Sequence, residues 1–142
     1  HAKARRGERE LIRLLHQHGY GALRTERVSP TLPSDIVSSL AIHIEVKRTG
    51  SVRITHNATL RQWVQDVRSD AGANTFWVIA WRPDYSHWLF LCDPRSVFVR
   101  EVPYVLVPTI EGMLSVYDSD RQDTVEAPED WEPHDLSKRH RT

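Results

Sequence analysis

Within residues 40–47, the side chains from Ile42 to Lys47 alternate strictly between apolar and polar. Because successive side chains of a β-strand point to opposite faces of the sheet, the two kinds of residue separate onto two faces. The apolar face carries Ile42, Ile44 and Val46. The polar face carries His43, Glu45 and Lys47. The pattern predicts a half-buried strand whose second face is charged.

Two other segments have apolar residues at helical spacing. Residues 4–18 place leucines on one side of a helix, and Gly19 follows as a typical left-handed C-terminal residue. Residues 57–71 carry a second apolar stripe that ends before Gly72. We therefore expect two amphipathic helices, each ended by a glycine.

The remaining apolar runs are short and are separated by turn residues. The expected strands cover residues 20–28, 35–37, 52–55, 76–81, 88–92, 104–107 and 113–117, and a short helix is expected over residues 95–100. The strands at 76–81 and 88–92 should form a hairpin. This order of elements predicts an α/β fold in which helices flank a mixed central sheet.

Size and composition narrow the class of protein. At 142 residues the chain fits one domain. Its longest apolar runs are far too short to cross a bilayer, and it opens without an export leader, so we expect an intracellular protein without a membrane partner. Cys92 is the sole cysteine, which excludes an internal disulfide and disfavours a structural zinc site.

The net charge of zero hides a strong asymmetry. Residues 1–30 carry seven Lys or Arg against three Asp or Glu, and residues 31–100 carry eight against six. Residues 101–142 reverse the balance, with four against ten. A basic body favours a nucleic-acid partner. We expect a domain over residues 1–117 and an acidic, flexible tail over residues 118–142.

Glu45 and Lys47 are the first candidates for chemistry. Their spacing places both side chains on the same strand face, where a carboxylate can bind a metal ion and an ammonium can neutralise charge. The backbone carbonyl of Val46 offers a further oxygen. Asp35 lies ten residues earlier, a separation at which antiparallel neighbours bring their ends together. A Glu-x-Lys triplet alone is usually a solvated charge pair on the exposed face of a strand, so the interpretation depends on Asp35 as well.

Glu8 adds a carboxylate from the first helix. It extends the apolar stripe of that helix, on the face that should meet the core. A carboxylate aimed at the core is unfavourable unless a charged group meets it. Pairing with Arg5 or with the helix dipole would also explain Glu8.

These residues together resemble the PD-(D/E)XK nuclease superfamily, and within it the archaeal-type and phage-borne Holliday-junction resolvases. The likeness runs over roughly residues 3–92. It is carried by Arg6-Gly7-Glu8-Arg9-Glu10-Leu11-Ile12, by His18-Gly19-Tyr20, by Arg24 and Asp35, and by Ile44-Glu45-Val46-Lys47. Gly7 stands closer to Glu8 than in the archaeal pattern, and Ser34-Asp35 replaces Pro-Asp.

The resemblance implies a restriction-endonuclease-like core and a role for each matching residue. Asp35, Glu45 and the Val46 carbonyl would bind Mg²⁺ or Mn²⁺, with Glu8 as a further candidate ligand, and Lys47 would position or activate water. DNA contacts would come from Arg5, Arg6, Arg9, Arg24, Arg27, Arg48 and Arg53. Further candidates are Ser29 or Ser34, before the aspartate, and Gln62 and Gln65 on the second helix.

The implied activity is metal-dependent hydrolysis of phosphodiesters at four-way DNA junctions by a homodimer. Branched double-stranded DNA would be the partner. Two alternatives stay open from the sequence. One is a related nuclease that cuts flapped, nicked or linear DNA, and the other is a DNA-binding accessory protein without catalytic activity.

Overall fold

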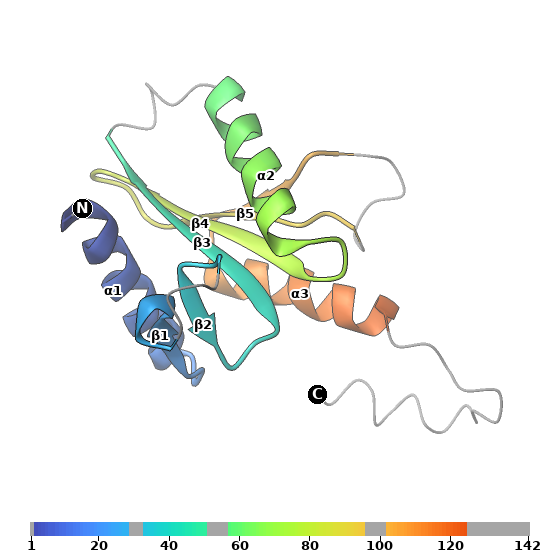
Figure 1. The fold of residues 1–142 in the computed structure, drawn as a ribbon, viewed down its shortest axis with the longest axis horizontal. Coiled ribbons are helices and arrows are strands. Elements are labelled where there is room, and N and C mark those ends of the chain that lie inside the picture. Colours follow the sequence, from blue (N-terminus) through green and yellow to red (C-terminus); the bar gives the residue numbers. More distant parts are fainter. Residues whose placement is uncertain (1, 29–32, 51–56, 96–101, 125–142) are drawn as a thin grey trace, which may run out of the picture.

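The computed structural model describes residues 2–28, 33–50, 57–95 and 102–124 (Figure 1). Within these residues the chain forms a mixed sheet with helices on both faces. In chain order the elements are α1 (Ala2–Gln17), β1 (Ala22–Arg24), the 3-10 helix η1 (Thr25–Arg27), β2 (Ile36–Ser38), β3 (Ile42–Thr49), α2 (Asn57–Ala71), β4 (Phe76–Pro83), β5 (Leu89–Cys92), β6 (Val105–Val107) and α3 (Ile110–Thr124). The expected α/β class is confirmed.

The order of strands across the sheet follows their order in the chain, from β1 to β6. Strand β3 runs antiparallel to β2 and parallel to β4. A parallel neighbour requires a crossover connection, and α2 provides it. The remaining pairs are antiparallel, including the expected hairpin of β4 and β5. None of the described helices is both long and apolar enough to span a bilayer.

The two faces of the sheet pack into separate apolar clusters. On one face the apolar side of β3 meets α1 and α3, and this cluster includes Leu11, Leu15, Ile44, Val46 and Met113. On the other face α2 covers β4, and this cluster includes Leu60, Val64, Val67, Trp77, Ile79 and Trp81. The polar face of β3 is therefore the face that α2 covers, at the side of the second cluster (Figure 1).

Gly7 allows α1 to approach β3 closely. A Cβ atom built on Gly7 would lie 2.5 Å from Cγ of Arg48 and 3.2 Å from Cγ1 of Val46, closer than real side chains pack. The glycine is thus required by the helix–strand contact rather than by its own backbone angles. Since Glu8 is the next residue, the same contact fixes where Glu8 stands relative to β3.

Two of the expected helix ends are confirmed by the backbone. Helix α1 ends at Gln17, and Gly19 has a φ of 86°. Helix α2 ends at Ala71, and Gly72 has a φ of 80°. Residues with a side chain rarely adopt such angles, so these glycines end the helices as expected.

The expected strand at residues 113–117 is wrong, because these residues belong to α3. Thr109 Oγ1 accepts a hydrogen bond from the Gly112 N–H at 3.0 Å, which is the N-cap contact of a helix. Ile110 and Met113 are then buried at helical spacing. An apolar run that reads as a strand is here one face of a capped helix.

Helix α3 also shifts the expected limit of the domain. It continues to Thr124, so a boundary at residue 117 falls inside the helix. The expected strand at 20–28 shortens to β1, followed by η1. The strand expected at 52–55, residues 96–100 of the expected short helix, and residues 125–142 of the tail lie outside the described residues.

Candidate active site

Asp35 and Glu45 lie side by side where β2 and β3 pair. The register joins Ile36 to Ile44, and the Asp35 N–H donates a hydrogen bond to the Ile44 carbonyl at 2.9 Å. Directly opposed residues of antiparallel strands point to the same face. Glu45 is accordingly one of the groups that act on the pKa of Asp35. We call Asp35 and Glu45 the acidic pair.

The environment of Asp35 disfavours its negative charge. Burial is the largest cause that raises the pKa of Asp35, and the hydrogen bond and charge of Glu45 and the charge of Glu8 raise it further. A hydrogen bond of 2.8 Å from the Val46 N–H to Oδ2 acts in the opposite direction. The result is a pKa of about 7, against an ordinary value of 3.8. The site therefore holds carboxylates that repel one another near neutral pH.

His43 holds the other side of the Glu45 carboxylate. Its Nε2 lies 2.9 Å from Glu45 Oε1, and the side chains are 6% and 15% exposed. A carboxylate can only accept this bond, so Nε2 carries the proton whenever Glu45 is ionised. The sequence placed His43 on the same strand face as Glu45 and gave it no role in the site. The structure instead places it in contact with a member of the acidic pair.

Lys47 lies two residues beyond Glu45, and its ammonium group is next to a tryptophan ring. Its Nζ is 5.6 Å from the ring centroid of Trp63, a cation–π distance. Trp63 packs edge-on against Trp81 with centroids 5.7 Å apart, and Trp81 Nε1 donates a hydrogen bond of 2.8 Å to Thr49 Oγ1. These contacts position the ammonium group of Lys47 on the face of β3 that α2 covers.

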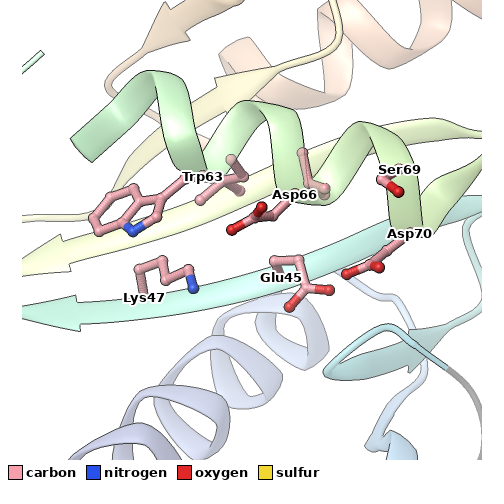
Figure 2. Close-up of a pocket in the computed structure, with 8 residues that line it drawn as sticks. Glu45, Lys47, Trp63, Asp66, Ser69 and Asp70 are labelled. Atoms are coloured by element: carbon pink, nitrogen blue, oxygen red, sulfur yellow. The ribbon is translucent and has the colours of Figure 1, made fainter. Parts of the chain in front are cut away.

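A cleft of about 320 Å³ opens between β3 and α2. Figure 2 shows Glu45 and Lys47 on β3, with Trp63, Asp66 and Asp70 on the neighbouring helix. The lining residues are Glu45, Lys47, Trp63, Asp66, Val67, Ser69, Asp70 and Ile79. The sequence did not single out Asp66, Ser69 or Asp70. Their helical spacing was visible, but which strand they would face depends on how α2 packs.

Glu8 is a half-buried carboxyl group on α1. Burial raises the pKa of Glu8, while the charges of Arg24 and Arg5 lower it. Its own charge acts on Asp35. Among the described residues, however, no three His, Cys, Asp or Glu side chains lie close enough together to form a metal-binding group. Glu8 therefore acts on the acidic pair through its charge. The two carboxyl groups that lie together are those of Asp35 and Glu45.

The other candidates fall into different environments. Arg5, Arg6, Arg9 and Arg27 are exposed, as expected for residues that contact DNA. Arg24 is half-buried and pairs with Glu26 at 3.0 Å. Ser34 Oγ lies 3.4 Å from Thr25 Oγ1. Gln62 donates a hydrogen bond to Asp66 at 3.0 Å, and Gln65 is exposed. Ser29 and Arg53 lie outside the described residues.

Arg48 is not placed as a DNA contact. Its side chain is 7% exposed, and its guanidinium pairs with Glu10 at 3.4 Å and with Asp84 at 3.3 Å. Arg82 joins the same group through Glu10 and through its carbonyl, which accepts a bond from Arg48. We call Glu10, Arg48, Arg82 and Asp84 the ion-pair network. Because the network already occupies Arg48, we leave it out of the DNA surface.

No protein-family model matches the chain, and no curated protein is significantly similar to it in sequence. Among solved structures, the chain is similar to that of Hjc, a Holliday junction resolvase from Archaeoglobus fulgidus. The identity is 24%, the match covers 79% of this chain and 88% of the other, and the TM-score is 0.41. The function proposed below therefore rests on the side chains of the site itself.

Proposed function

We propose that the protein is a metal-dependent endodeoxyribonuclease of the PD-(D/E)XK type that cuts branched DNA, most specifically as a Holliday-junction resolvase. The observation that supports the proposal is the acidic pair next to Lys47. Two carboxyl groups lie side by side on neighbouring strands, the pKa of Asp35 is raised to about 7, and the ammonium group of Lys47 belongs to the second residue after Glu45.

The acidic pair fits a divalent cation. Carboxylates that repel each other are stabilised when a cation comes between them. Magnesium is commonly held by one or two protein carboxylates together with water and phosphate oxygens, so a group of three acidic ligands is unnecessary. Asp35, Glu45 and the Val46 carbonyl would hold Mg²⁺ or Mn²⁺, with Glu8 near enough to act electrostatically. A cation bound there would acidify water and neutralise charge on phosphate.

Lys47 supplies the positive charge of the reaction. It lines the same cleft as Glu45, so a phosphate at the acidic pair would lie within its field. A fixed cation beside the reacting phosphate stabilises the charge that develops during the in-line attack of water. The Trp63 ring limits where the ammonium can go, because the lysine lies over its face.

The exposed arginines on α1 and η1 would bind the DNA backbone. Arg5, Arg6, Arg9 and Arg27 are candidates for phosphate contacts. Such contacts release counterions, so affinity should fall steeply as salt is added. A symmetrical cut across a four-way junction needs two related sites, and a homodimer provides them.

The test offers the protein equal amounts of four-way junction, flap, linear duplex and single strand, with Mg²⁺ or with a chelator. We expect paired nicks near the crossover of the junction, in the presence of Mg²⁺ only. Equal digestion of linear duplex would instead indicate a general nuclease of the same type. Absence of cleavage on every substrate would contradict the proposal.

Asp35→Asn separates an enzyme from an accessory DNA-binding protein. The variant keeps the size of the side chain but removes a ligand charge, so cleavage should fall at least about 100-fold. Junction binding in chelator should be unchanged, because Asp35 is not one of the exposed arginines on α1 and η1 that would contact the DNA backbone. A protein that binds junctions and shows no metal-dependent cleavage in either form would be the accessory protein.

A further inference from the structure

His43 is a buried polar side chain on β3, on the face of the sheet that α2 covers. It is 6% exposed, and its register partner on β4 is Trp77, a member of the apolar cluster under α2. Burial of an imidazole among apolar side chains is unfavourable unless its nitrogens find partners. The partner of Nε2 is the Glu45 carboxylate, 2.9 Å away.

This contact restricts Glu45 in a specific way. Glu45 has a flexible side chain, and an unrestrained carboxylate rotates among several positions. The bond from His43 fixes Oε1 of Glu45, beside Asp35 on the neighbouring strand. Asp35 is fixed in turn by the Val46 N–H at 2.8 Å. The acidic pair is thus held from both ends, by His43 and by the β3 backbone.

We infer that His43 is a positioning residue, which orients the Glu45 carboxylate for the cation. The inference rests on the proposed function. Ligands of a metal ion are commonly oriented by hydrogen bonds from neighbouring groups, and loss of such a group lowers metal affinity about 10–100-fold. The Nε2–H group of His43 is the donor in this contact, so the role needs no change in the charge of the ring. Its ring touches Glu45 and leaves the DNA-facing surface to other residues.

The test compares Mn²⁺ binding by full-length variants in the absence of DNA, measured by electron paramagnetic resonance. His43→Phe keeps the ring but removes the donor, and should weaken Mn²⁺ binding about 10–100-fold. His43→Gln places an amide N–H near the position of Nε2 and should recover most of the affinity. His43→Asn is polar but too short to reach Glu45, and should behave like His43→Phe.

Activity provides a second readout that a loss of packing would not reproduce. In His43→Phe the Mg²⁺ concentration needed for half-maximal cleavage should rise about 10–100-fold, while junction affinity in chelator stays at the wild-type value. His16→Phe is the matched control, because this histidine lies on α1 and bonds the Ala22 carbonyl at 3.2 Å. It should leave both Mn²⁺ binding and the Mg²⁺ requirement unchanged.

Glu45→Gln distinguishes the failure of this inference from the failure of the proposed function. If wild-type Mn²⁺ binding survives in Glu45→Gln, the acidic pair is not the metal site and the proposed function fails. If Glu45→Gln abolishes binding but His43→Phe binds like the wild type, only the role of His43 is overturned. Should His43→Phe fail to fold, His43→Asn and His43→Gln still decide: equal affinity in these two contradicts the inference.

Discussion

Strand β3 contributes to two groups of charged side chains that lie close together in the sequence and are neutralised differently. At Arg48 the ion-pair network joins acids to bases, because Glu10 and Asp84 each meet a guanidinium. At Glu45 the acidic pair joins an acid to an acid, and the neighbouring charges of Glu45 and Glu8 both raise the pKa of Asp35.

The difference separates a structural role from a functional one. A balanced set of charges around a buried guanidinium holds a helix and strands together, and its removal destabilises the fold. An unbalanced set of carboxylates weakens the metal-free fold, and a bound cation would offset that loss. Substitutions at the two groups should therefore have opposite effects on stability and on cleavage.

The largest expected effect is on cleavage at the acidic pair. Glu45→Gln removes a ligand charge and should lower the rate of junction cleavage at least about 100-fold. Because it also relieves repulsion with Asp35, the melting temperature in chelator should not fall. Single-turnover cleavage and thermal unfolding of the same preparation measure both effects. A substantial drop in melting temperature with normal cleavage would show that Glu45 has a structural role rather than a catalytic one.

The next largest effect is on stability at the ion-pair network. Glu10→Ala leaves the buried guanidinium of Arg48 without one of its two acidic partners, and such a loss costs about 2–3 kcal/mol of unfolding free energy. Cleavage per folded molecule should stay within about threefold of wild type. Urea unfolding gives the first quantity and active-fraction-corrected kinetics the second. A stable but inactive Glu10→Ala would move Glu10 into the catalytic group.

A smaller effect is expected at the contact between α1 and β3. Gly7→Ala would place a Cβ atom 2.5 Å from Arg48 Cγ, so the helix or the arginine must shift. Overpacking of this kind destabilises by about 1–3 kcal/mol. Since Glu8 follows directly, the variant should also raise the Mg²⁺ requirement. Urea unfolding that matches wild type would show that the helix moves freely, against the close packing described here.

The last expected effect, similar in size to that of Gly7→Ala, is a pH dependence of stability in the metal-free protein. The pKa of Asp35 is raised from 3.8 in the unfolded chain to about 7 in the folded protein. Between these values the folded protein keeps a proton that the unfolded chain has lost, so stability falls as the pH rises through this window. Urea unfolding in EDTA at about pH 5 and about pH 8 measures the slope.

Asp35→Asn should remove this part of the slope, since an amide does not titrate in the window. The variant should consequently be more stable than wild type at about pH 8 in EDTA, although it is inactive. A slope that is equal in the two proteins would show that Asp35 titrates normally.

Local pattern was enough to predict the acidic pair. The alternation at 40–47 set the face of Glu45 and Lys47, and the short separation from Asp35 allowed antiparallel pairing of the two acids. Both features, the alternation and the short separation, involve residues close together in the chain, so they can be recognised without knowledge of the packing. The metal and the roles of these residues stay predictions.

The other residues of the site are brought together by packing between elements that are far apart in the sequence. Because α2 packs on the polar face of β3, Trp63 lies next to Lys47. Because α1 packs against β3, Arg48 is buried beside Glu10. These contacts join residues far apart in the sequence, so periodicity does not reveal them. His43 was visible on the strand face of Glu45, but its burial depends on α2 as well.

The most direct test of the acidic pair as a cation site is anomalous diffraction from crystals of the protein grown with Mn²⁺. The account predicts a manganese peak in contact with carboxylate oxygens of both Asp35 and Glu45, and no such peak in Asp35→Asn crystals. A wild-type structure in which manganese is absent, or is bound away from these two carboxyl groups, would contradict it.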